Sequence, residues 1–316
     1  MKVLVVSGFL GAGKTTFISE MARRSKRKFV VMENEMGAVG VDGDYLSASL
    51  GEGVEIYELT QGCICCSMKT DFATSVLTIE SALQPDYLLV EPTGVGMLSR
   101  IMDNLGKIAY ERIELLSTIT VLDSLNWRQY AREFPEIFAD QLASAGTVVF
   151  SKAENLPSEE RRELESVVRS YAPSAEIVSQ PYGQQTAAWW EKLWLTSLDG
   201  SLIKEHASEE TGPELDIASL EDLSVSSPGL LVPFLEDVLR GRFGNIVRAK
   251  GNVQAGDFMV RFDVAGGQYC LTGSDAEKEV CKAVFIWKNL DKRALYKAFH
   301  AREHGQIGFD LGRFAA

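Results

Sequence analysis

Short apolar runs alternate with longer amphipathic segments through the first half of the chain. Such runs, rich in β-branched residues, predict strands covered on both faces, as in a parallel sheet. The predicted strands are residues 3–6, 29–32, 54–59, 87–90, 115–122, 147–150 and 176–178, and the predicted helices are 15–24, 70–83 and 158–169. Strands that alternate with helices predict an α/β fold with a doubly wound, mainly parallel sheet, whose ligands bind at the carboxyl ends of the strands.

The pattern changes in the second half of the chain. Residues 199–228 contain eight acidic residues against one lysine, which predicts a linker or a mobile excursion. The predicted elements after it are helices 231–240 and 291–300 and strands 245–248, 258–264, 268–271 and 283–288. They predict a smaller C-terminal α+β domain. We therefore expect a first domain at 1–195, an acidic linker at 196–229 and a second domain at 230–316.

Residues 7–16, with the sequence SGFLGAGKTT, lie between the first predicted strand and the first predicted helix. The spacing G-x-x-x-x-G-K-T is typical of a loop whose N–H groups surround nucleotide phosphates at the positive end of a helix dipole. Lys14 would neutralise the β- and γ-phosphates, and the Thr15 hydroxyl would bind Mg²⁺. We expect this loop to be exposed. The residues expected to contact the nucleotide or its Mg²⁺ here are Gly8, Gly11, Ala12, Gly13, Lys14, Thr15 and Thr16.

Acidic residues and glycines follow two further predicted strands. Residues 33–44 predict a polar loop where a nucleotide-dependent switch would lie, and an acidic surface loop is the alternative. Glu91 ends the strand at 87–90 and is followed by Pro-Thr-Gly94. In a phosphate-loop protein, an acid at this place can order the Mg²⁺ shell or the attacking water. Lys14 and Glu91 are therefore the candidate catalytic residues.

Three of the five cysteines lie within four residues, at Cys63, Cys65 and Cys66. Such crowding cannot make a disulfide framework, and in a reducing compartment it indicates metal binding or redox chemistry. Thiolates are soft, charged ligands suited to Zn²⁺ and other late transition metals. A carboxylate such as Glu33 or Glu35, or a client protein, could complete the metal shell.

Two other groups of side chains are interpreted as packing residues. Cys270 and Cys281 lie singly in apolar, strand-like runs and are predicted to be in the core. Trp189, Trp190 and Trp194 crowd one short segment. We predict that the tryptophans pack against the sheet or the second domain, and a client-binding surface is the alternative.

Composition narrows the class of protein. The 316 residues are 46% hydrophobic and 24% charged, as in an ordinary globular protein. The net charge of −12 argues against a nucleic-acid partner, which requires a basic surface. No stretch approaches the roughly 20 apolar residues that cross a bilayer. A signal peptide would have to be cleaved inside the phosphate loop, so we expect a cytoplasmic protein without a membrane partner.

Five segments, in this order, resemble the CobW-like family of metallochaperone GTPases, relatives of the urease and hydrogenase nickel-insertion GTPases. They are GFLGAGKTT, ENEMGAVGVDGD, GCICC, LLVEPTG and VVFSKAE. The resemblance covers residues 1–179, and RAKG at 248–251 resembles the family's C-terminal domain. It implies a P-loop GTPase that couples GTP hydrolysis to delivery of Zn²⁺, Co²⁺ or another divalent transition metal. The recipient would be a client metalloprotein, with a corrinoid-related one among the candidates.

The resemblance also implies roles for individual residues. Lys14 and Thr15 would bind phosphate and Mg²⁺, and Glu91 would take the Walker B role. The transferred metal would be bound by Cys65 and Cys66, with Cys63. Glu33 would be a further carboxylate ligand of that metal.

Two positions depart from the family's pattern. Ala38 stands where family members often carry an acid, which removes one metal ligand. The guanine-recognition segment is usually N/T-K-x-D, and here it is Ser151-Lys152-Ala153-Glu154. Lys152 can cover the purine face, and Glu154 can accept hydrogen bonds from guanine on a longer side chain than Asp. We expect GTP to bind better than ATP, by a margin that the sequence leaves open.

Two other functions fit parts of the pattern. A P-loop kinase would need a closing lid, but the chain has no arginine-rich lid, and a kinase has no need of the cysteine cluster. A non-catalytic, nucleotide-responsive metal sensor or store would not need Lys14, Thr15 and Glu91. His300 and His304 are spaced i, i+4, and we favour a solvated helix end over a second metal site for them. The sequence leaves the metal, the client and the oligomeric state open.

Overall fold

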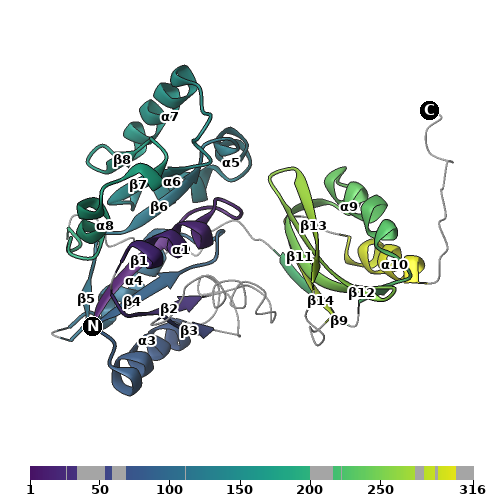
Figure 1. The fold of residues 1–316 in the computed structure, drawn as a ribbon, viewed down its shortest axis with the longest axis horizontal. Helices are drawn as coiled ribbons and strands as arrows, with labels where there is room; N and C mark the ends of the chain where they lie inside the picture. Colours follow the sequence, from purple (N-terminus) through teal and green to yellow (C-terminus); the bar gives the residue numbers. More distant parts are fainter. Residues whose placement is uncertain are drawn as a thin grey trace. The chain divides into compact units, whose positions relative to one another are not determined.

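The computed structural model describes residues 1–25, 27–33, 54–58, 69–110, 112–199, 216–221, 223–274, 281–288 and 291–303. The chain divides into two compact units, Met1–Pro213 and Glu214–Ala316. Each unit has its own sheet, as Figure 1 shows, and its own hydrophobic packing. We describe the two units separately.

The first unit is built on a parallel sheet with the strand order β3-β2-β4-β1-β6-β7-β8, and β5 pairs with β1. The strands are β1 (Lys2–Ser7), β2 (Phe29–Glu33), β3 (Val54–Glu58), β4 (Tyr87–Glu91), β5 (Glu114–Leu115), β6 (Ile119–Asp123), β7 (Thr147–Ser151) and β8 (Glu176–Val178). The helices are α1 (Lys14–Arg24), α3 (Lys69–Leu83), α4 (Leu98–Ile108), α5 (Trp127–Glu133), α6 (Pro135–Ala143), α7 (Ser158–Tyr171), η1 (Tyr182–Gln184) and α8 (Ala187–Leu193).

Helices cover both faces of this sheet. Alternate residues of β1 point to opposite faces, so Leu4 and Val6 join one core, while Val3 and Val5 join the other. The first core is completed by residues of α1 and α8, and the second by residues of α3 and α4. The predicted α/β fold with a doubly wound, parallel sheet is confirmed.

The two tryptophans of α8 and Trp194, which directly follows it, close the first core. Trp190 and Trp194 are almost completely buried, and Trp189 is 8% exposed. Trp190 packs against Phe17 of α1 with ring centroids 5.4 Å apart, and Trp194 packs against Phe29 of β2 at 4.9 Å. The prediction that these side chains pack against the sheet is confirmed, because their rings fill the space between the helices and the strands.

One predicted strand is divided in the structure. Residues 115–122 were expected to be continuous, but β5 ends at Leu115 and β6 begins at Ile119. The Thr118 hydroxyl between them donates to the Ser144 carbonyl at 2.6 Å, and the Thr118 carbonyl accepts from Thr147 N–H at 2.9 Å. These bonds hold the intervening segment out of the regular strand.

The second unit is a mainly antiparallel sheet with helices against one face, and only the short pairing of β10 with β11 among the described strands is parallel. Its strand order is β13-β12-β11-β14-β9, and β10 pairs with β11. The elements are β9 (Asp216–Glu221), β10 (Ser224–Val225), η3 (Pro228–Leu230), α9 (Leu231–Leu239), β11 (Asn245–Ala255), β12 (Phe258–Ala265), β13 (Gln268–Ser274), β14 (Lys282–Lys288) and α10 (Lys292–Glu303). Phe234 of α9 and Phe299 of α10 pack together in its core with ring centroids 5.2 Å apart. The predicted smaller α+β domain is confirmed.

Two expectations about this unit differ from the structure. Part of the expected acidic linker, 216–221, forms strand β9, because its backbone pairs with β14 and Leu220 packs against the core. The prediction that Cys270 is a core residue is wrong. Cys270 lies on β13 at the end of the strand order, and its side chain is exposed, while its neighbours Tyr269 and Leu271 pack against the core. Cys281 is partly buried against the core, as predicted.

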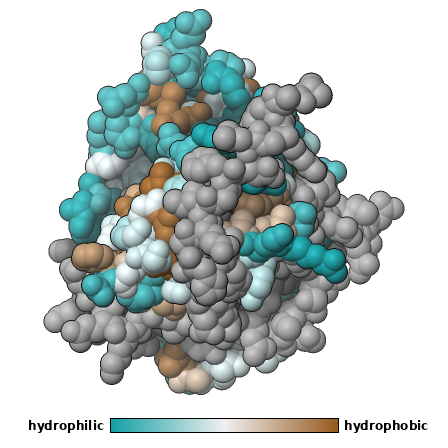
Figure 2. Space-filling model, turned by 90° about the vertical axis from the view of Figure 1, so that its right-hand side faces the viewer, coloured by the Kyte–Doolittle hydropathy of each residue, from teal (hydrophilic) through white to brown (hydrophobic). Residues whose placement is uncertain are grey.

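The described surface mixes polar and apolar residues. Figure 2 shows hydrophilic and hydrophobic residues interspersed over the described part of one face. The most exposed large apolar side chains among the described residues are Phe258, at 65%, and Leu125, at 61%. In the part of the chain that the structure describes, no helix has both the length and the hydropathy to cross a membrane.

Candidate nucleotide site

The phosphate loop (residues 7–16) connects β1 to α1 at the middle of the parallel sheet, where β1 lies between β4 and β6. Gly8, Gly11 and Gly13 have φ angles of 141°, 71° and 88°, in the region that favours glycine. A Cβ on Gly8 would lie 2.2 Å from the Val121 carbonyl oxygen, so a side chain there would displace β6. In folds of this class, ligands bind at the carboxyl ends of the parallel strands, at the topological switch point where the strand order reverses.

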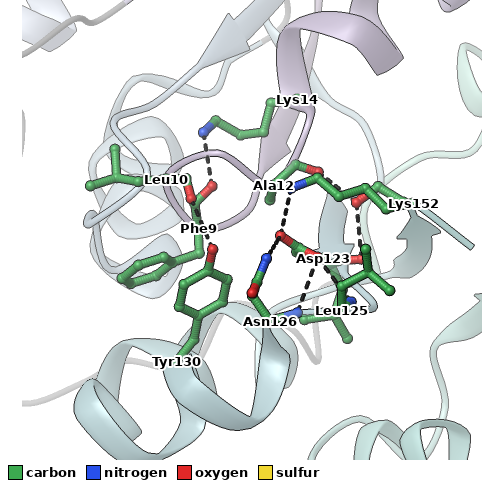
Figure 3. Close-up of polar contacts among 11 residues, drawn as sticks. Phe9, Leu10, Ala12, Lys14, Asp123, Leu125, Asn126, Tyr130 and Lys152 are labelled. Carbon is green, nitrogen blue, oxygen red and sulfur yellow. Dashed lines mark hydrogen bonds and ion pairs between the residues drawn. The ribbon is translucent and has the colours of Figure 1, made fainter. Parts of the chain in front are cut away.

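Three polar side chains meet at the start of α1. The Lys14 ammonium lies 3.8 Å from Glu91 Oε1, and the Thr15 hydroxyl donates to the same oxygen at 3.5 Å. Lys14 also donates to the Phe9 carbonyl at 3.4 Å, as Figure 3 shows. Lys14 is only 7% exposed and Glu91 12%, and Gly8 and Ala12 are buried as well, so the expected exposure is wrong for most of the loop. The lysine ammonium lies between the Phe9 carbonyl of its own loop and the Glu91 carboxylate at the end of β4.

The oxygen atoms of this group fit a hard divalent cation. Mg²⁺ binds one or two protein oxygen ligands and keeps the phosphates and water as the others. Thr15 and Glu91 offer a hydroxyl and a carboxylate within hydrogen-bond distance of each other, at the amino end of α1. The residues present therefore fit the Mg²⁺ of a nucleotide complex. The next residue, Thr16, is exposed.

The loop after β4 is held against the phosphate loop. A Cβ on Gly94 would lie 2.4 Å from Leu10 N, so only glycine allows this approach. The buried side chain of Gln141, from α6, donates to the carbonyls of Gly94 and Gly96 at 3.2 and 3.1 Å. Sequence reasoning did not identify Gln141. Its contacts with Gly94 depend on how α6 packs, which no local pattern signals.

The segment that starts with the last residue of β7, residues 151–156, lies beside the phosphate loop, and we call it the base loop. The Ser151 hydroxyl lies 2.6 Å from the Ala12 carbonyl and 3.2 Å from the Leu122 carbonyl. Arg161 of α7 donates to the carbonyls of Ala153 and Leu156 at 3.2 Å each. The loop is therefore tied to its neighbours on both sides, and the Glu154 side chain is exposed.

Lys152 and Asp123 form an ion pair across the ends of β7 and β6. The Lys152 ammonium lies 2.7 Å from Asp123 Oδ2, and Asp123 is completely buried (Figure 3). Lys152 has a φ angle of 55°, which costs an L-residue about 1–2 kcal/mol. The sequence analysis did not identify Asp123 as a site residue, so its contact with Lys152 was missed. The signal available was an acid at the carboxyl end of a strand that borders β1.

Aromatic residues pack against the phosphate loop and against α1. Phe9 stacks on Tyr130 of α5 with ring centroids 4.3 Å apart, and the Tyr130 hydroxyl donates to the Leu10 carbonyl at 3.5 Å. Tyr182, which follows β8, packs edge-on against Phe17 at 5.2 Å. Burial, with smaller contributions from the charges of Glu154 and Glu20, raises the pKa of Tyr182 above its usual value of 10.

Most of the predicted metal ligands lie outside the residues that the structure describes. Cys63, Cys65 and Cys66 are outside the described residues, as are Ala38 and His304. The backbone of Glu33 ends β2 in register with Glu91, and His300 lies within α10, but neither side chain is described. Among the side chains that are described, no group of three or more His, Cys, Asp or Glu is arranged to hold a metal ion.

Comparison with known proteins identifies both units. Residues 2–179 match the CobW/HypB/UreG nucleotide-binding domain, and residues 220–303 match the C-terminal domain of the cobalamin synthesis protein CobW. The zinc chaperone YeiR of Escherichia coli is 32% identical over 57% of this chain, a match that spans only 55% of YeiR. The zinc chaperone CobW of a Sinorhizobium species is 26% identical over 78% of this chain and 79% of its own length.

Among solved structures, the Zn(II)-bound YjiA GTPase of E. coli aligns over 96% of this chain and 98% of its own, at 17% identity and a TM-score of 0.46. The family match covers more than half of the chain and includes the phosphate loop, Glu91 and the base loop. The chain therefore belongs to the CobW/HypB/UreG nucleotide-binding family and carries a CobW-type C-terminal domain.

Proposed function

We propose that this protein is a GTP-hydrolysing metallochaperone that binds a divalent transition metal through Cys63, Cys65 and Cys66 and delivers it to a client metalloprotein. The observation that carries the nucleotide part is the meeting of Lys14, Thr15 and Glu91 at the end of β4. The metal part rests on the chemistry of the cysteine turn and on the relatives named zinc chaperones.

The three side chains have separable roles in the proposed reaction. Lys14 binds the β- and γ-phosphates, for which it leaves its present contact with Glu91. Thr15 and Glu91 would hold Mg²⁺, which when bound neutralises phosphate charge in the transition state. The Glu91 carboxylate is also placed to orient the attacking water. Cleavage of the bond between the γ-phosphorus and the bridging oxygen yields GDP and phosphate.

Base recognition is assigned to the base loop. The Lys152 stem would cover the purine, and the Glu154 carboxylate would accept from the guanine N1 and N2 groups. A hydrogen bond to a charged group is worth about 1.5–3 kcal/mol, which corresponds to at least a tenfold preference for GTP over ATP. The exposure of Glu154 leaves its carboxylate accessible to a nucleotide.

The cargo is proposed to be Zn²⁺, with Co²⁺ as the next candidate. Three thiolates can supply most of a tetrahedral Zn²⁺ shell, and a fourth ligand can come from Glu33 or from the client. Glu33 ends β2, and a single strand, β4, separates β2 from β1, the strand that leads into the phosphate loop. A carboxylate there could respond both to the nucleotide and to the metal.

The test measures nucleotide turnover and metal binding on the same full-length protein. The wild type should hydrolyse GTP with Mg²⁺ and bind one Zn²⁺ per chain in competition with a chelator. Cys65→Ala with Cys66→Ala should lose Zn²⁺ binding and keep GTP binding, and Lys14→Ala should lose hydrolysis and keep Zn²⁺ binding. Zn²⁺ binding that survives the cysteine changes would place the cargo elsewhere. Absence of GTP turnover in the wild type would favour a non-catalytic sensor.

A further inference from the structure

The carboxylate of Asp123 is completely buried and accepts four hydrogen bonds. Oδ1 accepts from Leu125 N–H at 2.9 Å and from Asn126 N–H at 3.2 Å. Oδ2 accepts from Asn126 Nδ2 at 2.8 Å and from Lys152 Nζ at 2.7 Å. Two carboxylate oxygens offer about four acceptor sites, so the group is fully used.

The two oxygens serve different structures. The bonds to Oδ1 form the turn that leads into α5, and Asp side chains commonly stabilise such turns. The turn does not need the bond from Lys152, which comes from a different strand, 29 residues away. Oδ2 therefore connects the turn to the base loop.

The ion pair with Asp123 determines which atoms of Lys152 can contact a ligand. The ammonium is held at Asp123, while the lysine side chain as a whole is 41% exposed. The accessible part is therefore largely the hydrocarbon stem, which can cover a flat apolar surface. The ammonium, paired with a buried carboxylate, is also kept from competing with Lys14 for phosphate.

We propose that Asp123 is a positioning residue for nucleobase recognition, which holds the Lys152 stem in place to cover the purine ring. The inference rests on the proposed nucleotide site. It adds that affinity for the base depends on a buried residue that does not itself touch the nucleotide. Ordering a long side chain on binding typically weakens affinity by about two- to twelvefold, and Asp123 removes that loss by ordering Lys152 beforehand.

The test compares GTP with inorganic tripolyphosphate, which has the phosphates but no base. Both displace a fluorescent GDP analogue from the full-length protein, so hydrolysis is not needed. Asp123→Asn retains an acceptor for the turn but places an amide donor against Lys152. We expect it to weaken GTP binding about two- to twelvefold and to leave tripolyphosphate binding unchanged.

Two further variants separate positioning from stability. Lys152→Met keeps a hydrocarbon stem but loses the bond to Asp123, so it should weaken GTP binding as much as Asp123→Asn does. This variant tests the proposal even if Asp123→Asn fails to fold. Asn126→Ala removes another partner of Asp123 without touching Lys152, so it should change neither affinity. The combination of Asp123→Asn and Lys152→Met should be no weaker than either alone, because Asp123 acts through Lys152.

The proposal is overturned if Lys152→Met binds GTP as the wild type does. It is also overturned if Asp123→Asn weakens GTP and tripolyphosphate by the same factor, which would indicate a general loss of structure. Absence of GTP hydrolysis in the wild type would contradict the proposed function but leave this comparison of binding intact. A wild type that binds GTP no better than tripolyphosphate would overturn both the proposed recognition of the base and the role of Asp123.

Discussion

The Thr15 hydroxyl lies 3.5 Å from Glu91 Oε1, although the two residues are 76 positions apart in the chain. Thr15 is the second residue of α1 and belongs to the phosphate loop, and Glu91 ends β4, the strand beside β1. The order of the strands thereby brings together the two oxygen atoms that we propose as Mg²⁺ ligands. The same Glu91 oxygen lies 3.8 Å from the Lys14 ammonium, so one carboxylate contacts both Thr15 and Lys14.

Replacing Glu91 with Gln should slow GTP turnover by at least tenfold while sparing nucleotide binding. The amide keeps the shape of the side chain but loses the charge that orders the Mg²⁺ shell and the attacking water. Single-turnover hydrolysis and nucleotide titration measure the two effects. Glu163→Gln is the matched control, because Glu163 is half exposed and pairs with Arg128 at the surface. Normal turnover in Glu91→Gln would show that the role assigned to Glu91 is wrong.

Replacing Gln141 with Ala should lower both stability and hydrolysis. The change removes the donor shared by the Gly94 and Gly96 carbonyls in a buried place, a loss of about 1–3 kcal/mol of unfolding free energy. Turnover should fall because the loop after Glu91 is no longer held against the phosphate loop. Denaturant unfolding and single-turnover hydrolysis are the measurements, and Gln129→Ala, at a partly exposed residue of α5, is the control. Equal turnover in the two variants would contradict the positioning role.

The stability of the first unit should fall as pH rises above about 10. The pKa of Tyr182 is raised, first by burial and then by Glu154 and Glu20, so its neutral form is favoured in the folded protein. That contribution is complete below the unfolded pKa of about 10 and is lost as pH rises through the higher folded pKa. Tyr182→Phe should flatten the decline in unfolding free energy between about pH 9 and 11. Tyr171→Phe, at a 43% exposed tyrosine, controls for the loss of a hydroxyl, and an equal effect of both changes would refute the assignment.

Metal affinity should rise with pH and depend on the cysteine turn. Thiols must lose their protons to bind metal, so protons compete with the ion at lower pH. Co²⁺ titration under anaerobic conditions should give a thiolate charge-transfer band for one ion per chain. Cys65→Ala with Cys66→Ala should abolish the band, and Cys270→Ala, at an exposed cysteine on β13, should not. A spectrum unaffected by the double change would direct attention to His300 and His304.

Elements whose signal is local were predictable from the sequence. Runs of β-branched residues predict the strands of the first sheet, and the spacing of the glycines and Lys14 predicts the phosphate loop. Helices α4, α5 and α6 were not predicted. For α4 a signal existed, since Leu98, Ile101, Met102 and Leu105 follow a helical period and are all buried.

The connections between loops were not predictable from local patterns. The contact of Lys152 with Asp123 depends on the parallel register that places Asp123 opposite Ser151. The contact of Gln141 with Gly94 depends on the packing of α6. Cys270 is exposed because side chains alternate along β13, so that Tyr269 and Leu271 point to the core and Cys270 points to the opposite face. Which face of the sheet is covered depends on packing between elements far apart in the chain. In each case, a long-range pairing decides the surroundings of a side chain.

The most direct test of the account is whether the nucleotide changes metal affinity. Zn²⁺ is titrated anaerobically, against a competing chelator, into protein loaded with GDP or with a non-hydrolysable GTP analogue. We predict tighter binding with the GTP analogue, by roughly five- to 150-fold, the range of a coupling of ~1–3 kcal/mol. By reciprocity, Zn²⁺ should tighten binding of the GTP analogue by the same factor, and the Cys65→Ala, Cys66→Ala protein should show no such effect. Identical Zn²⁺ affinities in the two nucleotide states would contradict the proposed chaperone cycle.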